Sequence, residues 1–431
     1  MRINFLAKAF FIAQAFALGS AVNPLRQFFP DDRSGAGIHP VDSLQNSGSV
    51  NAEFAAQNYI IVFKSHVADA EIEKHENWLQ SMHQKRSIDW HDVTNFVIKH
   101  TFNIGDLFRG YAGKLAPWLV RELQKHPDVL LVEPDQVMHV KEERTLAPWG
   151  LARISHKEKL NLVTFTRYQY DESAGEGVTA YVVDTGINTE HRDFGGRAVW
   201  GITIPTGEPD EDQNGHGTHV AGTIAGNTFG VSNKAKVVAV KVLNAEGSGL
   251  VSDIIKGIEW VYKASKNDTE SISSVVNMSL GGDASVALDT AVSAAIQQGL
   301  FFALAAGNEA QDACQVSPAR VSTAMTVGAM TWKDEVASFS NIGSCVDVFA
   351  PGHYVLSDWI GSDSAFMLLS GTSMASPHIA GLAAYFTALN HSLAYNPAAL
   401  KAHILSAATE GLLDNVPSDT PNLLAYNQYE A

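Results

Sequence analysis

The hydrophobic residues of this chain follow two patterns. From residue 148 onward, short apolar runs alternate with longer segments whose apolar residues recur at helical spacing. This alternation predicts an α/β domain with a largely parallel sheet over residues 148–431. Active sites in such sheets form beyond the carboxyl ends of the strands. The expected strands are 178–183, 237–242, 274–278, 300–305 and 325–327, and the expected helices lie near 216–226, 250–265 and 284–298.

Residues 58–140 show a shorter pattern of their own. Their segments have the order β-α-β-β-α-β, which is the split βαβ, or ferredoxin-like, arrangement. The pattern predicts a small α+β unit that folds only marginally alone and does not by itself indicate a function. The expected strands are 59–63, 96–104, 108–115 and 129–140, and the expected helices are 68–84 and 117–125.

The remaining segments lack such patterns. Residues 1–21 combine Arg2 and Lys8 with an apolar core and a small-residue end, which is typical of a signal peptide. Residues 22–57 are rich in Gly, Pro, Ser, Asn and Asp and predict a flexible leader. Residues 141–147 (KEERTLA) are charged, lack structure signals and resemble a processing linker.

Composition and charge limit the partners. The chain has 431 residues, 45% of them hydrophobic and 18% charged, with a formal net charge of −16 that lies mostly after residue 144. This acidity disfavours nucleic acid and favours a self-repelling protein, which we expect to be a monomer. Beyond the signal peptide no stretch is apolar enough to span a membrane. We therefore expect a secreted protein, with a vacuolar lumen as the alternative.

Four polar residues stand where chemistry is expected. Asp184 and Asn308 follow predicted strands in VVDTGI and AAGNE, while His216 and Ser373 open predicted helices in NGHGTHVAGT and SGTSMASPH. Each residue alone is more often a helix cap, a turn residue or a structural side chain. Together they have the order Asp, His, Ser, which is that of the subtilisin arrangement.

These residue types are the ones that acyl transfer requires. A serine hydroxyl becomes a nucleophile when a base takes its proton, and His216 can be that base near neutral pH. Asp184 would orient the imidazole, and Asn308 would donate to the oxyanion alongside the Ser373 backbone N–H. We expect Ser373 at the positive end of a buried helix whose first turn contains Pro377.

These segments, together with NMSLGG at 277–282, resemble the subtilase family of serine proteases, in its proteinase-K-like and cerevisin-like branch. The resemblance covers nearly all of residues 147–431, and residues 58–140 are similar to the subtilase pro-domain through FRGYAGKL and VLLVEPDQVMHV. It implies a subtilisin-like fold and hydrolysis of proteins with broad specificity and an apolar or aromatic preference. It also implies a pro-domain that acts as intramolecular chaperone and inhibitor, and catalysis without a cofactor.

The resemblance further implies the residues that contact a substrate. Two segments match the strands that flank a bound peptide, which would bind by β-augmentation. A third segment matches one wall of the primary pocket, where small residues leave room for a large apolar side chain. The three segments are Gly247, Ser248 and Gly249; Ser279, Leu280 and Gly281; and Ala305, Ala306 and Gly307.

Covalent modifications are predicted at a few positions. Cys314 and Cys345 are the two cysteines of the sequence, and in an exported protein they predict one disulfide, with two separate buried thiols as the alternative. Asn267 and Asn390 begin candidate glycosylation sequons. We exclude a third sequon, at Asn277, because it lies beside a predicted substrate strand.

No metal is expected in the chemistry. His219 follows His216 by three residues, but the HExxH pattern of zinc proteases is absent. Many relatives bind structural calcium, and Asp347 matches a carboxylate at one such site in proteinase K. Ser322 stands where that protein has a proline ligand, so structural calcium is left open.

Three classes of function fit the sequence. The first is a secreted serine endopeptidase made as a zymogen. The second is a catalytically inactive relative that acts as a binding module, which the intact set of catalytic residues disfavours. The third is an α/β-hydrolase esterase, because 371–375 is near the GxSxG elbow, but that class has Ser before Asp before His. Casein hydrolysis with and without a serine-directed phosphonyl inhibitor separates the three.

Overall fold

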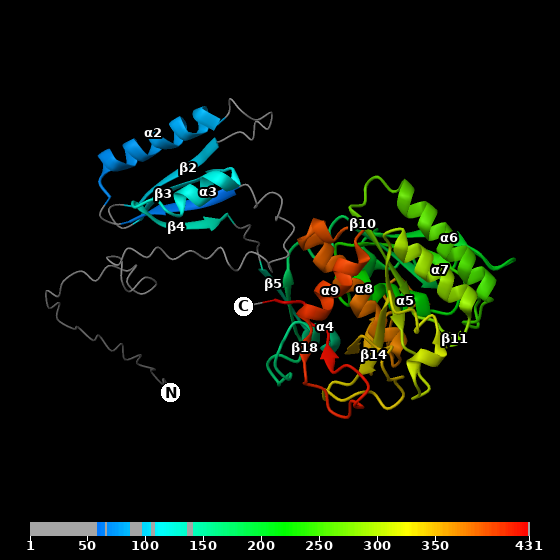
Figure 1. Ribbon diagram of the computed structural model, residues 1–431. Helices are drawn as coiled ribbons and strands as arrows, with labels where there is room; N and C mark the ends of the chain where they lie inside the picture. The colour runs from blue at the N-terminus through cyan, green and yellow to red at the C-terminus, as the bar shows by residue number, and fades with distance from the viewer. Residues whose placement is uncertain (1–57, 65–66, 87–96, 105–107, 136–140, 430–431) are drawn as a thin grey trace, which may run out of the picture. The chain divides into compact units, whose positions relative to one another are not determined.

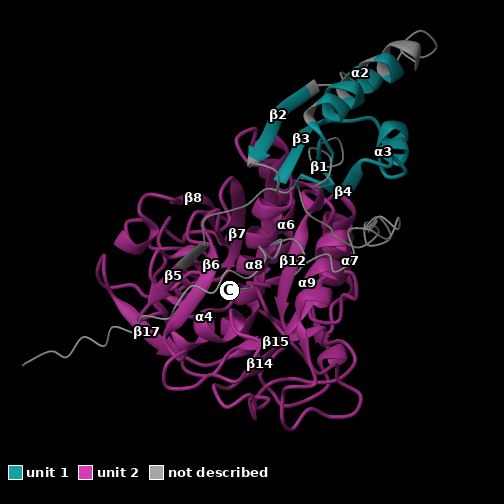
Figure 2. Cartoon of the chain, turned by 90° about the vertical axis from the view of Figure 1, so that its left-hand side faces the viewer, with its two compact units in different colours: residues 1–46, 55–136 teal, residues 47–54, 137–431 magenta. Residues whose placement is uncertain are grey.

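The computed structural model describes residues 58–64, 67–86, 97–104, 108–135 and 141–429. The predicted signal peptide and leader lie outside the described residues. The described residues form two compact units, 58–135 and 141–429, which Figure 2 shows in different colours.

In its described residues, the smaller unit has a four-stranded antiparallel sheet and two helices, which Figure 1 labels. Its sheet has the order β2-β3-β1-β4. Apolar side chains of β1, of the following helix and of the second helix share one core. The predicted β-α-β-β-α-β order is confirmed. The elements are β1 (Asn58–Phe63), α2 (Asp69–Arg86), β2 (Val97–Ile104), β3 (Phe108–Lys114), α3 (Pro117–Leu123) and β4 (Val129–Pro134).

The larger unit is built on a nine-stranded sheet with the order β18-β19-β15-β14-β12-β10-β7-β9-β8. Neighbouring strands are parallel from β8 to β19, and β18 alone pairs antiparallel. The predicted parallel α/β sheet is therefore confirmed. Its strands are β7 (Val178–Asp184), β8 (Ala198–Thr203), β9 (Lys236–Lys241), β10 (Ser273–Met278), β12 (Phe301–Ala305), β14 (Met325–Met330), β15 (Val348–Pro351), β18 (Thr409–Glu410) and β19 (Leu423–Leu424).

Helices bury both faces of this sheet. Along β7, Ala180 and Val182 join a core that includes side chains of α5, α8 and α9, whereas Tyr181 and Val183 join the core of α6 and α7. Burial on both faces explains why these strands are continuous apolar runs in the sequence. The main helices are α4 (Trp149–Ile154), α5 (His216–Ala225), α6 (Val251–Asn267), α7 (Val286–Gln297), α8 (Thr372–Leu389) and α9 (Pro397–Ala407).

The segment 141–147 differs from its prediction as an unstructured linker. Residues Lys141–Thr145 form strand β5, which pairs antiparallel with β6 (Arg167–Asp171) in the larger unit. The guanidinium of Arg144 donates to the carbonyls of Thr228 and Gly230 at 3.0 and 3.1 Å. These partners lie far away in the sequence, so the local charge pattern of the segment could not indicate them.

The two cysteines and the three sequons have clear structural positions. Cys314 and Cys345 form the predicted disulfide. Asn267 is exposed at the end of α6, so it remains a candidate for glycosylation. Asn390 is only 3% exposed and its side chain caps a short helix, so the prediction of a glycan there is wrong for the folded protein. Asn277 is fully buried, as its exclusion requires.

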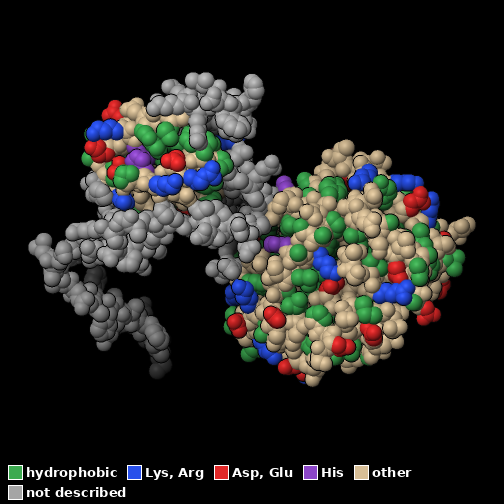
Figure 3. Space-filling model, in the orientation of Figure 1, with side chains coloured by type: hydrophobic (Ala, Val, Ile, Leu, Met, Phe, Trp, Pro, Cys, Tyr) green, Lys and Arg blue, Asp and Glu red, His purple; other side chains and the backbone are tan. Residues whose placement is uncertain are grey.

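The surface shows no single-sign patch on the side seen in Figure 3, where acidic and basic side chains are interspersed on each unit. Within the described residues, no helix combines the length and the apolar character needed to cross a membrane.

Candidate active site

The carboxyl end of β7 and the starts of two helices bring three predicted residues into place. Asp184 is the last residue of β7, His216 is the first of α5, and Ser373 is the second of α8. The Nδ1 of His216 lies 2.7 Å from Oδ1 of the fully buried Asp184, and the backbone N–H of Thr185 donates to the same oxygen at 2.8 Å. Asp184 is thus held to accept from the imidazole.

The Ser373 hydroxyl contacts the segment that follows β10. Its Oγ donates to the carbonyl of Ser279 at 3.3 Å, a long bond. To give its proton to the free Nε2 of His216, the hydroxyl turns away from this carbonyl. Long or misdirected bonds of this kind are common in enzymes without substrate and tighten when substrate binds.

A second carboxylate organises the start of α5. Asp212 is buried and accepts from the hydroxyl of Thr185 at 2.9 Å and from the backbone N–H groups of Gly215 and Thr218 at 2.8 and 2.9 Å. Burial by itself lowers the pKa of His216, but the charge and hydrogen bond of Asp184, with the charge of Asp212, outweigh it and raise this pKa above 6.5. In the sequence, the acidic run 210–212 is typical of a solvated loop, but its last residue, Asp212, is buried four residues before His216.

The expected oxyanion donors meet at the start of α8. The Oδ1 of Asn308 accepts from the backbone N–H and the hydroxyl of Thr372 at 2.8 and 3.0 Å, which leaves the amide Nδ2 to donate elsewhere. The Ser373 N–H lies in the first helical turn, where no intrahelical acceptor exists. Gly307 has φ +104°, and a Cβ there would lie 2.2 Å from Asn341, so this tight turn requires glycine.

Three buried side chains, those of Ser279, Asn277 and Ser376, form a hydrogen-bonded relay that ends at the Ser373 carbonyl. Pro377 is the sixth residue of α8, not part of its first turn as predicted, so it cannot donate to the Ser373 carbonyl four residues earlier. The Ser279 hydroxyl donates to this carbonyl instead, at 2.7 Å. Asn277 donates from Nδ2 to that hydroxyl at 2.9 Å, and its Oδ1 accepts from the Ser376 hydroxyl at 2.8 Å.

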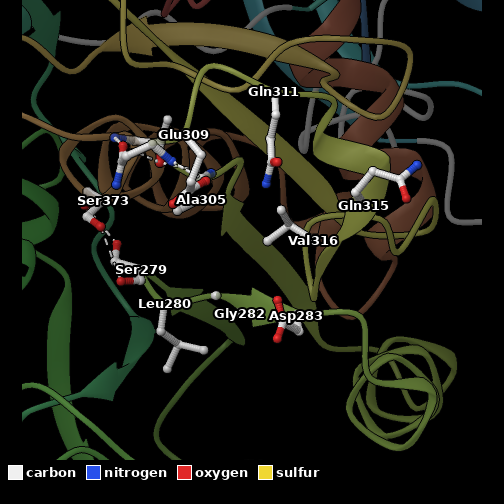
Figure 4. Close-up of a pocket in the computed structure, with 14 residues that line it drawn as sticks. Ser279, Leu280, Gly282, Asp283, Ala305, Glu309, Gln311, Gln315, Val316 and Ser373 are labelled. Atoms are coloured by element: carbon white, nitrogen blue, oxygen red, sulfur yellow. Dashed lines mark hydrogen bonds between the residues drawn. The ribbon is translucent and has the colours of Figure 1, made fainter.

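A cavity of about 320 Å³ opens beside Ser373 and Asn308 (Figure 4). Its buried lining includes Ala305 and Val316, which are apolar. Ser279 and Thr372 of the lining are also buried, whereas its larger polar side chains are exposed. The cavity therefore combines a deep apolar part with a polar edge, which carries Asp283, Glu309, Gln311 and Gln315.

The three predicted substrate segments differ in whether they line this cavity. Ser279, Leu280, Gly281, Ala305 and Gly307 line the cavity. Ala306 is fully buried in a separate cluster with Trp149 and Phe349, so its prediction as a pocket wall is wrong. Residues 247–249 are exposed and lie outside the cavity lining, and neither they nor 279–281 form a regular strand. A strand that pairs only with substrate has no partner in the free enzyme.

Side chains suited to a metal are not gathered in the described residues, since no group of three His, Cys, Asp or Glu is placed to hold an ion. His219 is fully buried, and its Nε2 lies 3.1 Å from the carbonyls of Val355 and Met367. Burial lowers its pKa to about 4, so it is a neutral structural histidine at neutral pH.

Comparisons with known proteins agree with this geometry. Residues 175–423 match the Subtilase family, Peptidase S8, and residues 58–141 match the Peptidase inhibitor I9 family. The chain belongs to the subtilase family: it is a subtilisin-like serine protease that carries an inhibitor pro-domain. This confirms the family resemblance.

Two similar proteins match this chain over 90% or more of its length, and one solved structure matches about two thirds of it. The "Subtilase-type proteinase psp3" of Schizosaccharomyces pombe is 60% identical over 100% of both chains. "Subtilisin-like serine protease Pen ch 18" of Penicillium rubens is 49% identical over 90% of this chain and 84% of its own. The "Crystal structure of a cold adapted subtilisin-like serine proteinase" matches with TM-score 0.61 and 45% identity over 66% of this chain and 100% of that chain.

Proposed function

We propose that the protein is an endopeptidase in which Ser373 is the nucleophile, His216 the general base and Asp184 the residue that orients it. The observation that carries this proposal is the 2.7 Å bond between His216 and the buried Asp184, beside a helix start that presents Ser373. This bond fixes the proton on Nδ1 and leaves Nε2 free to act as the base.

The reaction follows from these positions. As Ser373 Oγ bonds to the substrate carbonyl carbon, its proton passes to Nε2 of His216, and the carbonyl oxygen becomes an oxyanion. Asn308 Nδ2 and the Ser373 N–H stabilise that charge. The C–N bond then breaks, and His216 returns the proton to the leaving amine. Water, deprotonated by the same histidine, hydrolyses the acyl-enzyme and restores Ser373.

The cavity supports broad specificity with an apolar or aromatic preference. Its apolar depth, formed by Ala305 and Val316 between glycines, fits a large apolar side chain. The segments 247–249 and 279–281 offer backbone groups to both sides of an extended peptide. Main-chain pairing gives affinity without sequence selectivity, so most proteins with an accessible extended segment would be substrates.

The pro-domain and the N-terminal segment suggest how the enzyme is made. We infer that residues 58–140 inhibit the larger unit until they are removed, because they match an inhibitor family and precede the protease in the same chain. We also infer export, guided by residues 1–21 of the sequence, with a vacuolar lumen as the alternative compartment. A single disulfide suits either oxidising destination.

The test uses the purified enzyme on casein and on chromogenic peptides that differ only in the residue before the cleaved bond. We expect phenylalanine and leucine to exceed lysine and glutamate in kcat/KM, and a phosphonyl fluoride to abolish all activity while it labels Ser373. Val316→Trp fills the cavity and should shift the preference toward alanine. Labelling of a different residue, or equal rates for all peptides, would contradict the proposal.

A further inference from the structure

A lysine side chain occupies the place where family likeness suggests structural calcium. The Nζ of Lys401 lies 2.8 Å from each carboxylate oxygen of Asp347 and 2.9 Å from the carbonyl oxygen of Ser322. It also donates to the carbonyl of Ala324. The ammonium thus contacts one carboxylate and two backbone carbonyls, which are the oxygen ligands that Ca²⁺ prefers.

The surrounding elements fix this arrangement. Lys401 projects from α9, the two carbonyls belong to the turn before β14, and Asp347 directly precedes β15. The backbone N–H of Thr326 donates to Oδ2 of Asp347 at 2.8 Å and holds the carboxylate in place. The side chains of Lys401 and Asp347 are 16% and 22% exposed, so the pair is largely shielded from water.

The donors and acceptors balance without an ion. An ammonium group has three N–H donors, and here they have a carboxylate and two carbonyls to donate to. A calcium ion bound to the same oxygens at 2.3–2.6 Å would require the ammonium to leave, because two cations cannot share this space. The residues present therefore do not fit a metal while Lys401 is in place.

We propose that the Lys401 ammonium replaces calcium at this site, as a cation built into the chain that joins α9 to the turn before β14 and to β15. The larger unit then needs no Ca²⁺ here. The proposal rests on the contacts of Lys401 with Asp347, Ser322 and Ala324, and it does not depend on the proposed function.

The proposal predicts how the site changes when the lysine is shortened. Lys401→Ala removes the ammonium and leaves a carboxylate and two carbonyls around a space of ionic size. Lys401→Met removes the charge but keeps most of the side-chain volume. Calcium should therefore bind to the alanine variant and not to the methionine variant or to the native chain.

The experiment measures the unfolding temperature of the larger unit by calorimetry, in full-length protein with Ser373→Ala to prevent self-digestion. The native site should show no Asp347-dependent difference between EDTA and millimolar CaCl₂. Lys401→Ala should unfold about 3–6 °C lower in EDTA and recover most of that loss in CaCl₂. Lys401→Met should be destabilised without recovery. Lys266→Ala is the control, because this lysine donates to the carbonyl of Gln298 and lies over the rings of Tyr262 and Tyr395 but contacts no carboxylate among the described residues. It should show no difference between EDTA and CaCl₂ beyond that of the native chain.

Two outcomes would overturn the proposal. The first is a stabilisation of the native site by CaCl₂ that Asp347→Asn abolishes, because calcium would then bind despite Lys401. The second is a Lys401→Ala variant that calcium does not stabilise, because the oxygens would then not form a cation site. A calcium effect that persists in Asp347→Asn belongs to another site and leaves the assignment of this one intact.

Discussion

The two units of the molecule differ in how far apart in the sequence their paired strands lie. In the smaller unit, β2 and β3 are consecutive strands that pair antiparallel, and a single core lies between the sheet and its helices. In the larger unit, β7 lies between β9 and β10, and every parallel pair requires a crossover. Such non-local pairing is slow to form, whereas hairpins form quickly. A small, quickly formed unit ahead of a slowly formed parallel one is the arrangement expected if the first assists the folding of the second.

The cores of the two units also differ in the number of sheet faces that are buried. The larger unit buries apolar side chains on both faces of its sheet. The smaller unit places a buried histidine, His75, against Tyr111 within its only extended apolar cluster among the described residues. A small core with a titratable group is easier to unfold, which suits the proposed removal of this segment.

The largest expected effect separates chemistry from folding. Ser373→Ala should lower turnover by on the order of a millionfold, while both units keep their native transitions. The mechanism places the nucleophile in the larger unit alone, so the loss of activity should not change the stability of either unit. Casein hydrolysis and calorimetry measure the two quantities, and full peptidase activity in purified S373A would show that another residue is the nucleophile.

The next prediction separates the units physically. A chain of 141–431 expressed alone should yield little active enzyme, because the slow parallel sheet folds without its template. Adding the fragment 58–140 should restore refolding and then inhibit the product. A chain of 146–431 should refold less well even with the fragment, because it lacks β5 and the bonds of Arg144.

Refolding yield and inhibition by the fragment are read in one titration against a chromogenic peptide. Unaided refolding of 141–431 at a normal rate would remove the chaperone role from the smaller unit. Failure of the fragment to inhibit would remove the inhibitor role and leave the chaperone role untouched.

A smaller effect tests the relay behind the nucleophile. Ser279→Ala removes the donor to the Ser373 carbonyl, a bond worth about 1 kcal/mol, and should lower kcat about five- to tenfold with KM nearly unchanged. Ser279→Thr keeps a hydroxyl and should recover much of the loss. Ser265→Ala, a buried serine that bonds only within α6, is the control. A change confined to KM would mean that Ser279 acts on substrate binding and not on the nucleophile.

The last effect concerns acid and the smaller unit. Burial, and then the charge of His126, lower the pKa of His75 to about 4 in the folded state. Between pH 6.5 and 4 the unfolded chain binds a proton that the folded unit does not, so stability falls as the pH is lowered through this window. His75→Phe should flatten that dependence.

Hydrogen exchange of β1 and β3 amides at pH 5 and 7.5, in the Ser373→Ala chain, measures the effect. His126 faces His75 at a ring distance of 4.5 Å, and Asp128 lies beside His126, so some pH dependence should persist in His75→Phe. The exposed His100 on β2 provides the matched control, His100→Phe. An equal slope in the two variants would assign the pH response to other groups.

The sequence predicted the framework well for a physical reason. Buried strands and helices leave periodic signals, and Asp184, His216 and Ser373 stand at the ends of such elements. The disulfide was predicted from two cysteines in a chain with a predicted export signal. These features depend either on a local sequence pattern or on residue types that have few alternative roles.

The predictions that were wrong concern features that depend on contacts between distant parts of the sequence. The strand formed by 141–145, the burial of Asn390 and the burial of Ala306 depend on neighbours that are distant in the sequence. The local sequence also predicted neither the burial of Asp212, which stands in an acidic run typical of a solvated loop, nor the bonds of Asn277, because a single polar residue carries no period. Their roles become visible only when the fold brings β7, β10, α5 and α8 together.

The contacts of Lys401 also bear on where such an enzyme can work. An ion held by mass action is lost on dilution or in the presence of a chelator, and the stability it gives falls with its free concentration. A side chain is carried by its own backbone, so its local concentration is the same in every surrounding. The joint between α9, β15 and the turn before β14 would therefore be as strong in a calcium-poor lumen as in calcium-rich external fluid.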